Sequence, residues 1–234
     1  MRAVILSVDY GDLLAVVLPA WKAILPTACL SVATTAEDAE TRAVCARVGV
    51  PTIVTDAWTR SDPSVHVDGN PTFNMALGLD VSLGLTEGLV PRPSVGELLV
   101  HINADCYPTG VFPREPDLDP GVLYGVWRYG CSTPADLAAF RAGRRTFESF
   151  GHRQKNNGGR PVGYFQMWRY ENGLRYGSYA TAGKFDTHFC TRWMETPGHR
   201  MEMRDDVKLL HLGDQVEWAN WAGRVVPRWE GVPA

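Results

Sequence analysis

Residues 97–107, with the sequence ELLVHINADCY, decide the fold. An apolar run fills the first half of this stretch, and a glycine before it and a proline after it predict a short buried strand. Because side chains alternate along a strand, we expect Asn103 and Asp105 to project to the same side, with the small Ala104 between them. Amide and carboxylate oxygens suit Mg²⁺ or Mn²⁺. The stretch therefore predicts either a cation site or a simple turn that closes the strand.

Three similar units precede this stretch. Predicted strands at residues 3–8, 29–33 and 51–55 each lead into a polar turn, and helical patterns follow near residue 12, over 36–48 and around 73–83. Such alternation predicts a mostly parallel sheet, whose ligands bind beyond the carboxyl ends of the strands. These ends carry Asp9, Tyr10, Thr34 and Asp56. The pattern indicates a nucleotide site, although helix capping alone also explains some polar turns.

Composition narrows the class of protein. The chain has 234 residues, of which 45% are hydrophobic, so we expect a single α/β domain. A net charge of −3 and a pI near 6.1 argue against a uniformly basic nucleic-acid binder. The sequence contains neither an apolar run long enough to span a membrane nor a signal-peptide pattern, which predicts a cytoplasmic protein without membrane contact. Five scattered cysteines predict reduced thiols.

Two phosphate-binding motifs are missing from the sequence. No GxGxxG follows the first predicted strand, and GxxxxGK[ST] does not occur. Phosphates must then be neutralised in another way, and a divalent cation is the expected substitute. The absent glycine-rich loop also argues against a nucleotidyltransferase, which shares this type of sheet.

The second half of the chain predicts strands at 121–128, 161–168 and 207–212, and helices at 134–142 and 185–193. Between Arg141 and Arg175 there are eight Lys or Arg residues against two Glu. Phe147, Phe150, Tyr164 and Trp168 lie in the same segment. Arginines beside aromatic rings are typical of nucleic-acid recognition, and a solvated loop is the alternative interpretation.

With these elements placed, the sequence resembles the GT-A-fold glycosyltransferases, in particular small family-two-type enzymes of bacteria and phages. The resemblance spans most of the chain and implies one domain, with residues 1–106 binding the nucleotide sugar and residues 107–234 binding the acceptor and closing the site. The matching segments, in chain order, are 8–10 (VDY), 55–57 (TDA), 73–74 (FN), 101–105 (HINAD), 163–166 (GYFQ), 185–186 (FD) with Phe189, 211–213 (HLG) and 220–224 (NWAGR).

The resemblance implies a role for each matched position. Asn103, Asp105 and His211 would bind Mn²⁺ or Mg²⁺, and Asp186 is the candidate catalytic base. The positions that would bind the donor are Asp9, Tyr10, Thr34, Asp56, Asn74, Asn103, Ala104, Asp105, Gln166 and Arg224. From the residues alone, each of these two residues also has a purely structural interpretation. His211 could be a histidine of the core, and Asp186 could be a helix cap.

Two departures from the family pattern are evident. Asn103 replaces the first acid of the metal motif, which removes one negative charge from the site. Met75 stands where the family commonly has lysine, so this phosphate contact is either absent or supplied from elsewhere, with Arg224 or Arg160 as candidates.

The predicted function is transfer of a sugar, with inversion, from a UDP-sugar to an acceptor hydroxyl. The basic segment suggests a hydroxymethylpyrimidine of DNA as acceptor, flipped out of the duplex, in a bacterial cell or a phage-infected host. The alternatives are a saccharide or other small acceptor, or a protein that binds nucleotide sugars without catalysis.

Overall fold

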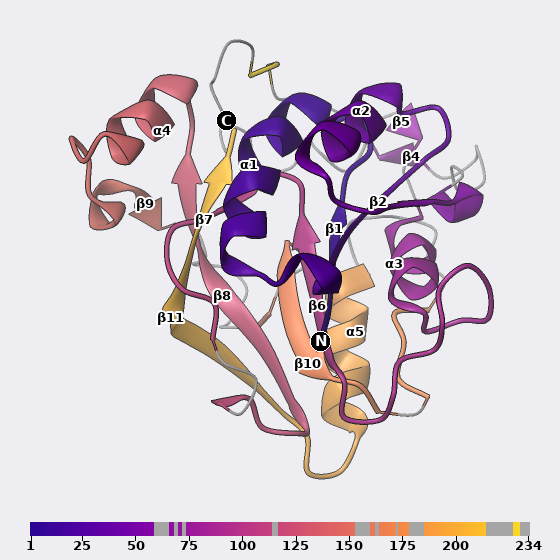
Figure 1. Ribbon diagram of the computed structural model, residues 1–234. Coiled ribbons are helices and arrows are strands. Elements are labelled where there is room, and N and C mark those ends of the chain that lie inside the picture. Colours follow the sequence, from indigo (N-terminus) through magenta and orange to yellow (C-terminus); the bar gives the residue numbers. More distant parts are fainter. Residues whose placement is uncertain are drawn as a thin grey trace.

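The computed structural model describes residues 1–58, 66–67, 70–71, 74–113, 117–152, 160–161, 164–171, 173–177, 185–213 and 227–229. They form an α/β domain around a nine-stranded sheet with the order β3-β2-β1-β6-β10-β8-β11-β7, in which β9 pairs with β8 (Figure 1). The strands of this sheet are β1 (Arg2–Leu6), β2 (Leu30–Thr34), β3 (Thr52–Val54), β6 (Leu98–Asn103), β7 (Cys106–Pro108), β8 (Val122–Cys131), β9 (Gly151–His152), β10 (Phe165–Arg169) and β11 (Arg200–Leu212). Strands β4 (His66–Val67) and β5 (Asn70–Pro71) form a separate small ladder.

The sheet is mixed, which corrects the expectation of a mostly parallel one. Strands β3, β2, β1 and β6 are parallel, as the alternating pattern predicts. Beyond them, β10 is antiparallel to both β6 and β8, whereas β8 and β11 run parallel to each other. The short edge strand β7 runs antiparallel to β11. An antiparallel strand in the middle allows β6, β8 and β11 to point in the same direction.

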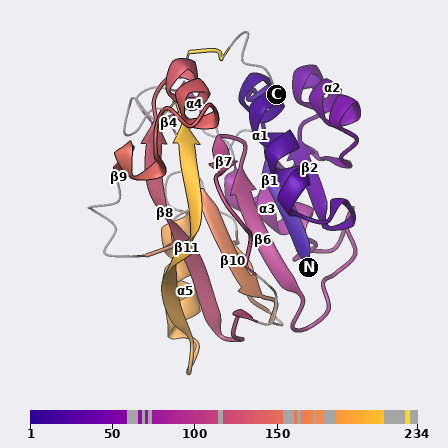
Figure 2. The same ribbon diagram turned by 60° about the vertical axis from the view of Figure 1, so that its left-hand side comes forward.

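The carboxyl ends of the parallel strands lie at one edge, as expected. Leu6 of β1 stands opposite Ala33 of β2 and Asn103 of β6, and Thr34 stands opposite Val54 of β3. Six strands share this direction: β1, β2, β3, β6, β8 and β11. The turns after β1, β2, β3 and β6 therefore lie at the same edge of the sheet as the ends of β8 and β11. Figure 2 shows β8 and β11 side by side, with their arrowheads close to α4.

Five helices flank the sheet: α1 (Gly11–Ile24), α2 (Ala39–Val48), α3 (Met75–Leu83), α4 (Pro134–Arg141) and α5 (Phe185–Glu195). Two of them start and stop at clear signals. Asp38 caps α2 by accepting a hydrogen bond from the Thr41 amide, and Gly49 ends it at a φ of 72°. Asn74 caps α3 in the same way through the amide of Leu77.

The core has one layer on each face of the sheet. Odd residues of β1, such as Ala3 and Ile5, pack with α1 and α2. Even residues, such as Val4 and Leu6, pack with α3 and α5 (Figure 1). This alternation fixes which side chains of β6 face α5, a point that matters for the site below. Among the described residues, none of the helices is both long and apolar enough to span a membrane.

Candidate functional site

Asp105 and His211 meet at the carboxyl edge of the sheet. Asp105 lies in the turn after β6, and its Oδ2 is 3.3 Å from Nε2 of His211 near the end of β11. The two residues are only 5% and 7% exposed. Strand pairing explains the contact, because His211 stands opposite Cys106, the residue that follows Asp105. The structure thus brings together two residues that the sequence predicts as part of one site.

Arg128 of β8 completes a relay that the sequence did not reveal. Its Nη2 lies 3.3 Å from Nδ1 of His211, and its guanidinium lies 5.9 Å from the ring centre of Tyr164. A guanidinium has no acceptor, so Arg128 must donate and Nδ1 must accept. With Nδ1 accepting, a ring proton lies on Nε2, the nitrogen that faces Asp105. We call Arg128, His211 and Asp105 the relay.

The relay keeps the carboxyl of Asp105 ionised. Burial raises the pKa of this carboxyl, but the combined effect of His211 and Arg128 is larger, and the pKa lies below its ordinary value. The positive charge of Arg128 and the negative charge of Asp105 therefore offset each other across the imidazole.

Asn103 has a different partner. Its Oδ1 is 3.0 Å from Nε2 of His101, two residues earlier on the same face of β6. Burial lowers the pKa of His101 to about 4, so the imidazole is neutral near pH 7. The regular strand ends at Asn103, and Asp105 lies in the turn that follows. Each of these two residues is bonded to its own histidine.

The start of α5 lies beside His101. The ring of Phe185, the first residue of α5, is 6.1 Å from the His101 ring. Asp186 follows in the first turn, half-buried, and its Oδ1 accepts the amide of Thr187 at 2.7 Å. Asp186 lies inside the helix, so the interpretation of this residue as a plain N-cap is wrong. The contact of Phe185 places the first turn of α5 beside His101 of β6.

Three predicted donor-binding residues are engaged in the fold itself. The buried hydroxyl of Thr34 lies 3.2 Å from Oδ2 of Asp38, to which it donates. Asn74 caps α3. Gln166 is fully buried, where its amide donates to the Pro161 carbonyl at 3.1 Å and accepts the hydroxyl of Tyr176 at 2.7 Å. These contacts satisfy buried polar groups and lend no support to a donor role for the side chains.

The remaining predicted positions lie along the same edge. Asp9 follows β1 with a φ of 62°, and its amide donates to Asp38 at 2.9 Å. Tyr10 packs against the α1 side of the core, and the amide of Ala104 donates to the Leu6 carbonyl. Asp56 is exposed and opens the short 3-10 turn Asp56–Trp58. Arg160 is exposed, and Arg224 lies outside the described residues.

The predicted metal ligands supply both oxygen and nitrogen atoms, and two of them contact each other. Oδ2 of Asp105 faces Nε2 of His211, and Oδ1 of Asn103 contacts His101. Arg128 adds a positive charge next to these groups. Within the described part of the chain, no three His, Cys, Asp or Glu side chains are grouped so as to hold a metal ion. Binding of Mn²⁺ or Mg²⁺ by Asn103, Asp105 and His211 stays a prediction.

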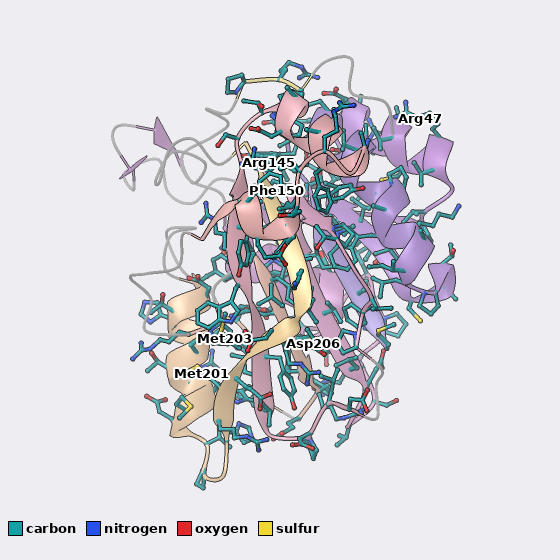
Figure 3. All side chains as sticks on the ribbon, turned by 90° about the vertical axis from the view of Figure 1, so that its left-hand side faces the viewer. Arg47, Arg145, Phe150, Met201, Met203 and Asp206 are labelled. Carbon is teal, nitrogen blue, oxygen red and sulfur yellow. The ribbon has the colours of Figure 1, made fainter. Side chains whose placement is uncertain are left out.

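The basic segment is also different from the prediction. The four aromatic residues predicted to stack on bases are all buried: Phe147, Phe150, Tyr164 and Trp168. Arg145 lies 4.0 Å over the Phe150 ring and is paired with Asp136, and Arg141 lies 5.0 Å over Tyr107 (Figure 3 shows Arg145 next to Phe150). The prediction that these rings stack on exposed bases is wrong, because they are part of the core: Phe150 packs against Phe140 of α4, and Trp168 packs against Phe189 of α5.

The fold and the site define an α/β protein with a polar, arginine-containing site beyond the strand ends. No protein-family model matches the chain, and no curated protein matches its sequence. Among solved structures, a mycobacterial protein is 13% identical at a TM-score of 0.47, with 91% of this chain and 65% of that chain covered. This chain therefore spans less than two thirds of the length of that protein.

Two further solved structures are similar. One is glucosyl-3-phosphoglycerate synthase from Mycobacterium tuberculosis with Mg²⁺ and UDP, at 12% identity and a TM-score of 0.45, with 90% and 69% of the two chains covered. The other is mouse xyloside xylosyltransferase 1, at 9% identity and a TM-score of 0.32, with 83% and 73% covered. All three TM-scores are below 0.5, so the function has to be argued from the residues of this chain.

Proposed function

We propose that this protein is a glycosyltransferase that moves a sugar from a nucleotide-sugar donor, with UDP as the expected carrier, to an acceptor hydroxyl. The observation that carries the proposal is the meeting of Asp105, His211 and Arg128 at the strand ends, where open α/β sheets bind nucleotides. A further carboxylate, Asp186, follows Phe185, whose ring lies 6.1 Å from that of His101 on β6, and this neighbourhood supports Asp186 as the candidate base. Binding of a diphosphate requires charged groups such as those of the relay. Activation of a hydroxyl requires a separate carboxylate.

In the proposed reaction, the oxygen of the acceptor attacks the anomeric carbon as the bond to the nucleoside diphosphate breaks. The carboxylate of Asp186 accepts the proton of the hydroxyl, and the configuration of the sugar inverts in this single displacement. Asp186 lies in the first turn of α5, where the helix dipole favours its negative charge. The departing diphosphate gains negative charge and has to be stabilised by positive groups at the strand ends.

The acceptor that fits best is a saccharide or another small molecule with a free hydroxyl. A flipped base would need exposed aromatic side chains on which to stack. The aromatic residues predicted for that role are buried, and Arg145 is paired with Asp136. A hydroxymethylpyrimidine of DNA therefore has no support from this segment.

The test is a panel of nucleotide sugars with release of the nucleoside diphosphate as the measurement, with and without saccharide acceptors. We expect turnover with at least one UDP-sugar, and we expect Asp186→Asn to abolish it while Glu195→Gln, at the far end of α5, does not. Tight binding of a nucleotide sugar without any release would instead identify a non-catalytic binding protein. Absence of both binding and release would overturn the proposal.

A further inference from the structure

One edge of the sheet is only partly covered. Strand β11 pairs with β8 on one side, whereas on its other side β7 pairs only with the residues from Leu209 to His211. Residues 200–206 of β11 have no neighbouring strand on that side within the described part of the chain. Figure 3 shows this half of β11 at the front of the sheet. We call residues 200–206 the open edge.

The open edge has backbone groups that point away from the sheet. The amide of Arg200 donates to the carbonyl of Gly121, just before β8, at 3.0 Å. Because backbone groups alternate between the two sides of a strand, those of Met201 and Met203 point away from β8. No backbone partner for them is present among the described residues. Unpaired groups of this kind are a template on which a further strand can bind.

The two faces of the open edge differ in chemistry. Met201 and Met203 lie on the side of α5, as Figure 3 shows, and residues with even numbers lie on the opposite face. The residues on that face are all charged, and in chain order they are Arg200, Glu202, Arg204 and Asp206. Their signs therefore alternate along the strand.

Some of these charges are paired within the chain. Nη2 of Arg204 lies 2.6 Å from Oδ2 of Asp206, and Nη2 of Arg200 lies 2.8 Å from Oδ2 of Asp119. Exposed ion pairs are weak, and a carboxylate accepts hydrogen bonds from more than one cation. The side chains of Arg200, Glu202 and Asp206 are 53%, 43% and 55% exposed. The charges of the open edge can therefore also interact with a second chain.

The order of the charges is complementary to itself when the strand is reversed. In an antiparallel pair of open edges centred on Met203, Arg200 lies opposite the partner's Asp206. Glu202 then lies opposite the partner's Arg204. Opposite charges directly across two strands stabilise the pair, and like charges destabilise it. Moving the centre by one residue, to Glu202 or to Arg204, places like charges opposite each other, whereas the register centred on Met203 joins opposite charges at all four charged positions.

We propose that the open edge is a dimer interface, at which a second copy of this chain adds its own open edge in the antiparallel direction and extends the sheet across both copies. In this dimer Met203 exchanges backbone hydrogen bonds with its counterpart, and Met201 pairs with the partner's Asp205. The same surface serves on both chains, which gives a closed two-fold pair. The inference does not depend on the proposed function, because the open edge contains no residue of the relay.

The first test is sedimentation velocity of the wild-type protein over a series of concentrations. We expect a reversible dimer with a dissociation constant of about 1–100 µM, because a single short strand makes a small interface. A wild-type protein that stays monomeric at about 1 mM would overturn the inference.

Two charge variants test the complementarity. The acidic variant combines Arg200→Glu with Arg204→Glu, and the basic variant combines Glu202→Lys with Asp206→Lys. Each variant alone places like charges across the strand pair, so we expect its self-association to weaken tenfold or more. An equimolar mixture should form a heterodimer with about wild-type affinity, because acidic residues then meet basic ones at every charged position. Arg47→Glu, on the exposed surface of α2 (Figure 3), is the control and should dimerise like the wild type.

Met203→Cys tests the register without changing a charge. In a hydrogen-bonded antiparallel pair the opposing Cα atoms are about 5.5 Å apart, a separation that a disulfide spans. We expect mild oxidation to link two copies of this variant. Met201→Cys should stay unlinked, because its two copies lie about 14 Å apart in this register. The wild type, with its five native cysteines, gives the background.

Three results would contradict the proposed dimer. They are self-association of both charge variants at wild-type strength, folded variants whose mixture stays monomeric, and linking of Met203→Cys no faster than that of Met201→Cys. Each of these results would leave the glycosyltransferase proposal standing, because none of them measures turnover.

Discussion

The Nε2 atom of His211 lies 3.3 Å from Oδ2 of Asp105, so a buried polar contact joins the end of β11 to the turn after β6. These segments come from opposite parts of the chain and are held together by the pairing of β11 with β7. The contact therefore depends on the tertiary fold and not on local sequence. It also places one end of the relay beside the strand that carries Asn103.

Asp105→Asn should make the protein less stable at neutral pH. The pKa of the Asp105 carboxyl is lowered in the folded state, so its stabilising contribution is present above the unfolded pKa and is lost as the pH falls through the folded value. Removing the charge leaves Arg128 uncompensated, at a cost of about 3 kcal/mol. Urea unfolding at pH 7 should show this difference, and the difference should shrink in acid. The exposed Glu37→Gln is the control, and a gap that stays constant with pH would contradict the explanation.

Asp80 should show the opposite pH dependence. This residue of α3 is 1% exposed, and its carboxylate accepts the amides of Tyr176 at 2.7 Å and Gly177 at 2.8 Å. Burial raises its pKa to about 6, so the folded state holds a proton that the unfolded state releases. Its contribution to stability should fall by about 2–3 kcal/mol as the pH rises from 4 to beyond 6.

Asp80→Asn isolates this effect. The variant loses an acceptor for one of the two amides, which is a cost that does not depend on pH. The difference in unfolding free energy between wild type and variant should decline as the pH rises through this range and then level off. If urea unfolding gives a flat difference, Asp80 has an ordinary pKa and the burial argument is wrong. Asp117→Asn, at an exposed position, serves as the control.

Asp186→Asn should lower turnover by about 100-fold or more while binding of the donor is kept. The substitution preserves the shape of the side chain but removes the proton acceptor. The melting temperature should change little, because a charge in the first turn of an exposed helix is worth only about 0.3–1 kcal/mol. Steady-state kinetics with a fixed UDP-sugar give the measurement. Unchanged turnover would assign the base to another residue.

Arg145 and Arg144 should differ in their effect on stability. Arg145 is paired with Asp136, bonds to Ser149 and covers Phe150, whereas Arg144 is exposed. We expect Arg145→Met to cost about 1–2 kcal/mol in urea unfolding and Arg144→Met to cost almost nothing. Neither variant should change UDP binding. Salt-sensitive DNA binding at low ionic strength that Arg144→Glu abolishes would revive the nucleic-acid interpretation.

The sequence predicts the strands and helices well because their signals are local. Apolar runs identify β1, β2, β3 and β6, and Gly49 ends α2 as expected. The first half of β11 is missed because charged residues alternate with partly exposed methionines, as in Met201 and Met203 (Figure 3). The edge strand β7 is missed because it has only three residues and ends in proline.

The candidate site is predicted less completely because it depends on pairing between distant strands. In the sequence, Arg128 is only the last residue of a predicted strand. The pairing of β8 with β11 is what brings it next to His211. The capping role of Asn74, by contrast, has a local signal, because asparagine directly before a helical pattern is a common start residue. The burial of Phe150 beneath Arg145, and of Trp168 against α5, could not be distinguished from a stacking surface, since both arrangements use the same residue types.

Asn103→Asp should raise the affinity of the chain for Mn²⁺. The substitution restores a second carboxylate next to Asp105 and adds the negative charge that the relay does not supply, and charged oxygens raise affinity for Mg²⁺ and Mn²⁺. In the natural chain, Oδ1 of Asn103 is bonded to the neutral His101, a contact that an aspartate oxygen retains. Titration with Mn²⁺ followed by electron paramagnetic resonance should show binding by the variant and little by the wild type. Asp105→Asn in the same background should remove it again, because the two carboxylates act as a pair. Equal Mn²⁺ binding by wild type and Asn103→Asp would mean that Asp105 alone attracts a cation despite Arg128, contrary to the charge balance proposed for the relay.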